Sequence, residues 1–188
     1  FGRVNYDYKS KYLLSLVLRR DGYSKLPKDN RWGTFPGISA GWVLSRENFM
    51  ESCSNVLSYA KIRASYGANG NVSGVLDANG NVVTGLEYYT VQGSYGIMKD
   101  KDGKIVPNYN GKVPLMINDL PNPTMRWEKS YTFETGFDIG FLNNKYILNF
   151  TYYNRRTQDK FAEITLPSHS GVSSFLSNNV EVQNQGME

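Results

Sequence analysis

The chain has 188 residues and a net charge of +4, and it is rich in aromatic residues and glycine, with 14 Tyr, 9 Phe and 18 Gly against 7 Pro. The Lys and Arg residues are dispersed, so we expect no nucleic-acid partner, and the single cysteine, Cys53, excludes an intrachain disulfide framework and a cysteine-rich zinc site. No window approaches the run of about twenty apolar residues that a membrane helix needs. The composition favours an all-β protein. A mean hydropathy of -0.48 still allows a membrane barrel, because barrel strands are polar at every second residue.

Apolar and polar residues alternate through the first third of the chain, which is typical of strands with one apolar and one polar face. The alternation predicts strands over residues 1–8, 12–21, 35–45 and 60–67. On the apolar face of these strands lie Leu14 and Trp42, and on the polar face lie Arg3, Asp7 and Arg63.

The cleanest alternation comes near residue 130, where Phe133 and Phe137 alternate with Glu134 and Asp138. This segment is about as long as a tilted strand must be to cross a bilayer. After a tight turn the pattern resumes with Leu148 on the apolar face. We therefore predict strands over 130–141, 145–156 and 181–188.

The connections between the predicted strands alternate between short and long. Those at 9–11 and 142–145 are short and the one at 46–59 is moderate, whereas the predicted loops over 22–34, 68–129 and 157–180 are long. Bacterial outer-membrane barrels have short periplasmic turns and long extracellular loops. The fold class we predict is an all-β, antiparallel transmembrane β-barrel.

Seven strands do not close such a barrel, and a bilayer does not tolerate unpaired strand edges. We therefore expect residues 1–188 to be part of one barrel domain of roughly 22 strands, the number typical of plugged outer-membrane transporters. No signal peptide, plug domain or initiator methionine is recognisable in this sequence. We interpret the chain as part of a longer protein.

Several sequence motifs, in the same order along the chain, resemble those of the SusC/RagA family of TonB-dependent transporters. They are FGRVNY (1–6), KYLL (11–14), RRDG (19–22), RWGTFP (31–36), SAGW (39–42), KIRASYGANGN (61–71), NPTMRWE (122–128) and YYNR (152–155). The segment between Gly70 and Asn122 departs from the family pattern in length.

The resemblance implies a nutrient importer in the outer membrane of a Gram-negative, Bacteroidetes-like cell, and no enzyme. It implies a SusD-like surface lipoprotein as the partner that covers the barrel. It also implies energy from TonB through an N-terminal plug, and an oligosaccharide or a peptide as the substrate. No cofactor, metal or catalytic residue is expected, and the lone His169 has no nucleophile or base arrangement beside it in the sequence.

The candidate site residues fall into three groups. We expect Arg3, Asp7, Arg63, Glu134 and Asp138 to face the barrel lumen, where they either contact plug or substrate or simply pair with one another. We expect Leu14, Trp42, Phe133, Phe137 and Leu148 to face lipid. In the longest loop we expect Tyr88, Tyr89, Tyr95 and Tyr109 to contact the substrate or the lipoprotein that covers the barrel. The alternative is that these tyrosines pack within the loop itself.

Two other interpretations remain open. A soluble or surface-exposed glycan-binding β-sandwich would explain the tyrosines, glycines and alternation, but neither the strand lengths nor the one-sided loops. A passive porin would share the barrel and lack TonB coupling.

Overall fold

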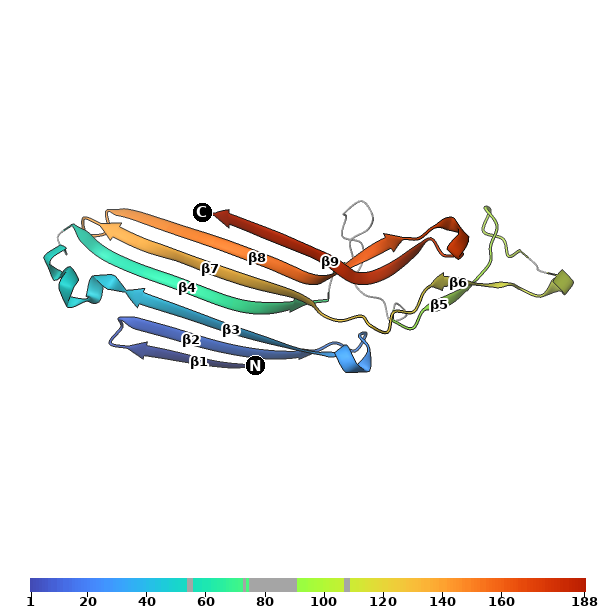
Figure 1. Ribbon diagram of the computed structural model, residues 1–188, viewed down its shortest axis with the longest axis horizontal. Coiled ribbons are helices and arrows are strands. Elements are labelled where there is room, and N and C mark those ends of the chain that lie inside the picture. Colours follow the sequence, from blue (N-terminus) through green and yellow to red (C-terminus); the bar gives the residue numbers. More distant parts are fainter. Residues whose placement is uncertain (54–55, 73, 75–90, 107–108) are drawn as a thin grey trace.

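The computed structural model describes residues 1–53, 56–72, 74, 91–106 and 109–188. Its main element is one seven-stranded antiparallel sheet in the order β1-β2-β3-β4-β7-β8-β9 (Figure 1). The strands are β1 (Gly2–Tyr8), β2 (Tyr12–Gly22), β3 (Trp32–Val43), β4 (Leu57–Asn71), β7 (Glu128–Phe141), β8 (Tyr146–Thr165) and β9 (Ser174–Met187). A separate two-stranded sheet pairs β5 (Ser94–Ile97) with β6 (Leu115–Asp119). The predicted all-β antiparallel fold is confirmed.

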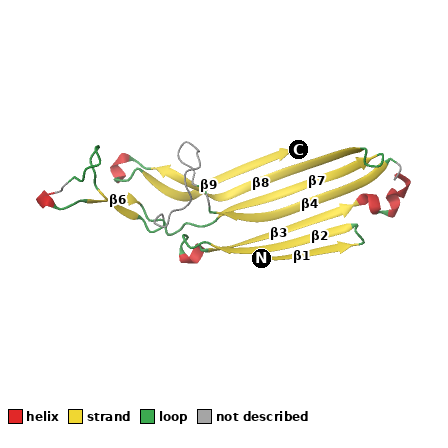
Figure 2. Cartoon of the chain, turned by 180° about the vertical axis from the view of Figure 1, so that it is seen from behind, coloured by secondary structure: helices red, strands yellow, loops and turns green. Residues whose placement is uncertain are grey.

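Strands that follow one another in the main sheet are also neighbours in space, so the sheet is an up-and-down meander that turns at its two ends (Figures 1 and 2). At one end lie the short β1–β2 and β7–β8 turns and the 3₁₀ segments η2 (Leu44–Arg46) and η3 (Asn48–Cys53). At the other end lie η1 (Lys28–Asn30), η5 (Ser168–Ser170) and the β5–β6 hairpin. We call these the short-turn end and the long-loop end.

Three strands are much longer than the alternation predicted. β4 covers Leu57–Asn71 rather than 60–67, β8 runs to Thr165 rather than 156, and β9 begins at Ser174 rather than 181. The predicted loop over 157–180 is therefore wrong in its extent, because most of it continues the β8–β9 ladder. Near the long-loop end both faces of these strands carry polar residues, so the apolar–polar alternation ends there. The backbone hydrogen bonds between the strands continue beyond that point.

The short-turn end is held by a carboxylate that joins two separate connections. Glu47 accepts hydrogen bonds from the Trp42 indole at 3.1 Å and the Lys11 ammonium at 3.0 Å, and Arg46 donates to the Ser10 carbonyl at 3.1 Å. The Trp42 and Lys11 hydrogen bonds lower the pKa of the Glu47 carboxyl below its ordinary value. The β1–β2 turn is thus fastened to the connection after β3.

The buried core lies at the long-loop end, where the sheet splits. β3 pairs with β4 only from Gly37 to Val43, and its remaining residues, Trp32 to Pro36, pair with β2 alone. A hydrophobic cluster packs beside this split, with Tyr23, Val72, Val91 and Leu176 around it. Its buried members are Leu26, Phe35, Met125, Trp127 and Phe161.

Phe35 is the centre of the cluster and requires two glycines. A Cβ added at Gly33 or at Gly70 would overlap the Phe35 ring, so only glycine leaves room for it. The Trp127 ring meets the Phe35 ring edge-on at 5.5 Å, a favourable aromatic geometry. Three of the sequence motifs, RWGTFP, KIRASYGANGN and NPTMRWE, therefore meet at one packed point.

Polar side chains tie this cluster to the neighbouring strands. Glu128, which is 1% exposed, accepts hydrogen bonds from the Phe161 amide at 2.8 Å and the Asn71 side chain at 3.0 Å. The Trp127 indole donates to the Arg31 carbonyl at 3.1 Å, and the Asn122 side-chain Nδ2 donates to the Leu176 carbonyl at 2.8 Å. The NPTMRWE motif is thus explained as the junction between β3, β4, β8 and β9.

We predict that Gly70→Val in the full-length protein lowers the stability of the folded barrel by roughly 1–3 kcal/mol, since the new side chain displaces the Phe35 ring. Heat-modifiable electrophoresis, in which unfolding changes mobility, measures the loss. Gly67→Ala on the same strand is the matched control, because its Cβ would meet its nearest atom at 3.6 Å. Equal melting of the Gly70→Val and Gly67→Ala proteins would contradict this account of Phe35.

Candidate functional site

The register of the ladder sorts every strand into the same two faces, because directly paired residues of neighbouring strands point to the same side of a sheet. One row across five strands is entirely apolar and aromatic, and consists of Tyr12, Trp42, Ile62, Phe137 and Phe150. The row on the opposite face crosses all seven strands and is mostly polar or small. It consists of Asn5, Ser15, Ser39, Ser65, Glu134, Tyr153 and Gly186. We call the two sides the apolar face and the polar face.

The sequence-predicted residues separate cleanly between these faces. By register, Leu14, Trp42, Phe133, Phe137 and Leu148 share the apolar face. The five predicted polar residues, Arg3, Asp7, Arg63, Glu134 and Asp138, share the other. Which face meets lipid and which meets the lumen remains a prediction at this point.

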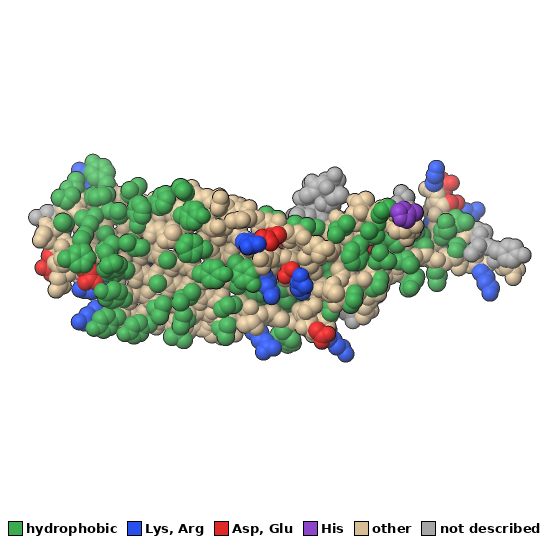
Figure 3. All heavy atoms as spheres, viewed as in Figure 1, with side chains coloured by type: hydrophobic (Ala, Val, Ile, Leu, Met, Phe, Trp, Pro, Cys, Tyr) green, Lys and Arg blue, Asp and Glu red, His purple; other side chains and the backbone are tan. Residues whose placement is uncertain are grey.

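The apolar face is largely uncovered. Val4 is 64% exposed, Leu18 is 55% exposed, and Tyr66 and Leu148 are each 52% exposed. Hydrophobic side chains spread over the short-turn half of the sheet, and charged ones gather toward the long-loop half (Figure 3). Soluble monomers rarely expose a contiguous apolar surface of this kind, so something apolar must cover it.

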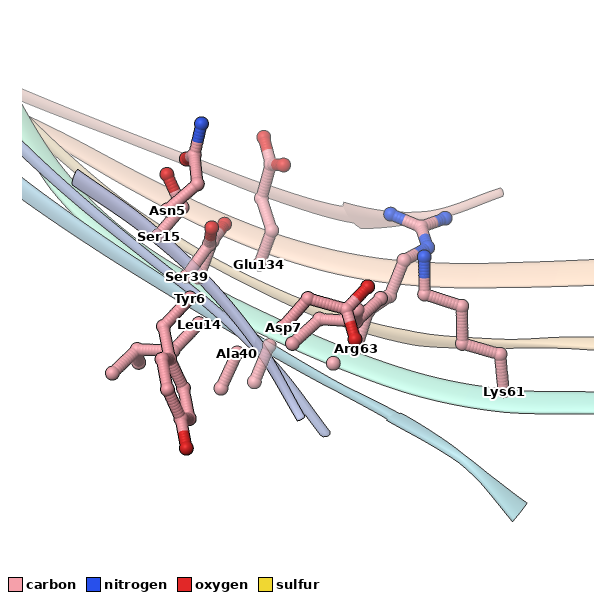
Figure 4. Close-up of a pocket in the computed structure, with 14 residues that line it drawn as sticks. Asn5, Tyr6, Asp7, Leu14, Ser15, Ser39, Ala40, Lys61, Arg63 and Glu134 are labelled. Carbon is pink, nitrogen blue, oxygen red and sulfur yellow. The ribbon is translucent and has the colours of Figure 1, made fainter. Parts of the chain in front are cut away.

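The polar face is hollowed. A depression of about 520 Å³ lies over β1 to β4 and β7, and its polar lining includes Asn5, Asp7, Lys61, Arg63 and Glu134. Asn5, Ser15, Ser39 and Glu134 extend to one side of the strands, whereas Tyr6 and Leu14 extend to the other (Figure 4). Leu13, Leu14 and Ala40 also line the hollow, and its charged groups come from β1, β4 and β7.

A chain of charged and hydroxyl groups crosses the polar face between β4 and β8. The Arg63 guanidinium lies 3.5 Å from the Asp138 carboxylate and donates to the Thr151 hydroxyl at 2.6 Å. Arg155 donates to the Thr132 hydroxyl at 3.3 Å. Glu134 lies between these groups and lines a second hollow with Arg63 and Arg155. The predicted pairing of Asp138 with a cation is observed, while Asp7 accepts a hydrogen bond from the Ser10 backbone amide at 2.7 Å in the β1–β2 turn.

The sequence did not single out the small polar residues that make the hollow possible. Ser15, Ser39 and Ser65 form the middle of the polar row, and their short side chains leave space above β2, β3 and β4. Each lies at a polar position of the alternation, so strand register would have been the signal that joined them.

The loop tyrosines are only partly described. Tyr88 and Tyr89 lie outside the described residues, and Tyr109 lies at the start of η4 (Tyr109–Gly111). Tyr95 is on β5 and is 75% exposed. Tyr95 is not among the residues that line the polar hollow, and the role of the four tyrosines as contact residues stays a prediction.

Two further structural findings concern metal sites and helices. Within the described ranges, no group of three or more His, Cys, Asp or Glu side chains is placed to hold a metal ion. The Asp100 carboxylate accepts hydrogen bonds from the backbone amides of Asp102 and Lys104, at 3.0 and 2.8 Å, and so stabilises a turn.

Among the residues that the structure describes, no helix is long and apolar enough to cross a membrane.

Comparison with known proteins decides the family. The model of the family described as "TonB dependent receptor-like, beta-barrel" matches residues 1–188. This chain belongs to that family. The resemblance to SusC/RagA proteins is confirmed by relatives with which it shares a third or more of its residues.

The chain is 36% identical over 188 residues to "TonB-dependent receptor P3" of Formosa agariphila, and 33% identical over 189 residues to "TonB-dependent receptor SusC" of Bacteroides thetaiotaomicron. Both alignments cover 100% of this chain and 17% of the relative, so the chain spans about a sixth of the length of these curated relatives.

Solved structures show the same fold at lower identity. The RagAB peptide importer in its closed-closed state aligns with a TM-score of 0.78 and 24% identity, over 98% of this chain and 18% of that one. The siderophore receptor PirA from Pseudomonas aeruginosa aligns with a TM-score of 0.56 and 16% identity, over 99% of this chain and 29% of that one.

We predict that Phe137→Lys costs the full-length protein roughly 2–4 kcal/mol of stability in a bilayer, because it places a charge on the apolar face. Ser65→Lys is the control, since Ser65 lies opposite Glu134 on the polar face. Refolding into lipid vesicles at graded denaturant concentrations measures both variants. If Phe137→Lys were as stable as Ser65→Lys, the apolar face would not meet lipid.

Proposed function

We propose that this chain is a wall segment of a TonB-dependent nutrient importer in the outer membrane of a Gram-negative, Bacteroidetes-like cell. The observation that carries the proposal is the two-faced sheet, apolar on one side and hollowed and polar on the other, in a chain that matches a TonB-dependent receptor family over its whole length. In this function the apolar face meets lipid and the polar face lines the lumen.

The two ends of the sheet suggest its orientation. Outer-membrane barrels keep short turns in the periplasm and long loops outside. The short-turn end, with Glu47 and the β7–β8 turn, would then be periplasmic, and the β5–β6 hairpin would reach outward (Figure 1).

The proposed partner is a SusD-like surface lipoprotein, and the proposed substrate is an oligosaccharide or a peptide. Two similarities support them, one to a receptor named SusC and one to the RagAB complex, which is described as a peptide importer. Exposed Tyr95 on the β5–β6 hairpin is a candidate contact for substrate or lipoprotein, and Tyr88, Tyr89 and Tyr109 are candidates from the sequence. On the lumen side we propose contacts to plug or substrate from Arg3, Asp7, Arg63, Glu134 and Asp138.

The exposed apolar face argues against the soluble glycan-binding sandwich. A sandwich covers the inner face of each sheet with a second sheet, yet in the described part of the chain the only other sheet is the two-stranded β5–β6 pair, which lies beyond the long-loop end (Figure 1). The apolar face would then be open to water. A passive porin and an importer would share this barrel segment and differ in their dependence on TonB. The experiment therefore measures that dependence.

The test is uptake by cells that depend on the full-length transporter, with and without a functional TonB. We expect the protein to sediment with the outer membrane, to co-purify with a lipoprotein, and to lose uptake of oligosaccharides or peptides when TonB is deleted. Uptake that persists without TonB would support the passive porin instead. A protein found in the soluble fraction would contradict the proposal altogether.

A further inference from the structure

A hollow of about 520 Å³ that is distinct from those of the polar face lies on the apolar face near the long-loop end. It spans β1, β2, β3 and the facing side of β4, and its wall is mostly hydrocarbon. The apolar-face side chains around it are Val4, Leu16, Leu18, Pro36, Ile38 and Tyr66. Arg3, Val17 and Gly37, which share a row at polar-face positions, and Gly2 complete the lining.

A fixed cation lies directly beyond the hollow on the same face. Arg20 is two residues past Leu18 on β2, so its Cα is roughly 7 Å from that of Leu18 along the strand. Its guanidinium lies over the Trp32 ring at 5.3 Å. Trp32 in turn lies across Gly22, where an added Cβ would come within 2.9 Å of the indole. Glycine therefore lets the indole lie flat and hold Arg20 at the edge of the hollow.

Among the described residues, the Arg20 guanidinium contacts the Trp32 ring and forms no ion pair with a carboxylate. The neighbouring cations differ. Arg19 points to the polar face and pairs with Asp21, and Arg156, which shares the apolar face, pairs with Glu181. Figure 3 shows charged side chains gathered beyond the hydrophobic area, toward the long-loop end. A membrane barrel meets lipid headgroups beyond its apolar band.

We propose that the hollow and Arg20 together bind one phosphate-headed lipid of the outer leaflet, with an acyl chain in the hollow and the phosphate on the Arg20 guanidinium. Arginine presents a planar set of donors that matches phosphate oxygens. The ring of Trp32 holds these donors in place without supplying a counter-charge. This site is separate from the proposed transport function, and rests on the apolar face meeting lipid and on the long-loop end lying on the outer side of the membrane.

The test uses the full-length transporter in phosphatidylcholine nanodiscs and measures the apparent Kd for phosphatidic acid by native mass spectrometry. Arg20→Gln is expected to weaken phosphatidic acid binding about tenfold, as the loss of one charge-assisted contact. Ile38→Trp is expected to weaken it as well, because the larger side chain fills the hollow while Arg20 stays in place. Ile38 is 48% exposed, so the substitution is compatible with folding.

Arg19→Gln is the matched control, since it removes the same charge one residue away on the other face, and it should leave the Kd unchanged. Diacylglycerol, which has the chains and no phosphate, should bind the wild type as weakly as phosphatidic acid binds the Arg20 variant. Unchanged binding by Arg20→Gln would overturn the proposal, as would an equal loss in Arg19→Gln. Full competition by inorganic phosphate would show a site for the free anion instead of a lipid. Failure to enter nanodiscs would reveal that the transporter assignment itself is wrong.

Discussion

The structure depends on one constraint, that backbone N–H and C=O groups inside a bilayer must find partners within the protein. In a meander of paired strands, each backbone N–H and C=O group bonds to the neighbouring strand. The side chains are then free to differ between the two faces of the sheet. Because side chains alternate at every residue, one continuous ladder presents an aromatic row such as Trp42, Ile62 and Phe137 to one side and a row with Ser39, Ser65 and Glu134 to the other. The free edges of β1 and β9 fit a sheet that continues in the longer proteins of this family.

At the long-loop end, side-chain packing holds the strands together where the backbone pairing between β3 and β4 stops. The sheet splits between β3 and β4, and Phe35 and Trp127 pack beside the split. Glycines at 33 and 70 admit the Phe35 ring, and buried Glu128 binds backbone and side chain of two neighbouring strands. The family motifs are therefore mainly structural at this point. They build the packed base from which the connections at this end extend.

Much of the fold could be predicted from period-2 alternation, because a single residue of slip would exchange the two faces completely. The faces of Phe137 and Glu134 followed from this alone, and the register agrees. The outer halves of β8 and β9 were missed because both of their faces mix polar and apolar residues there and the register shifts between Thr157 and Ala162, so the segment shows no period-2 alternation. The Phe35 cluster was also missed as a unit, since its members come from segments far apart in sequence and no local pattern joins them.

The central claim is that lipid meets one face and water the other along every strand. Spin labels at single cysteines introduced along β7, from 132 to 139 and with Cys53 replaced by Ser, test this in vesicles of the full-length protein. The account predicts that relaxation by oxygen, which concentrates in lipid, peaks at positions 133, 135, 137 and 139, while relaxation by a water-soluble nickel complex peaks at 132, 134, 136 and 138. Nickel relaxation that is equal on both faces would contradict it.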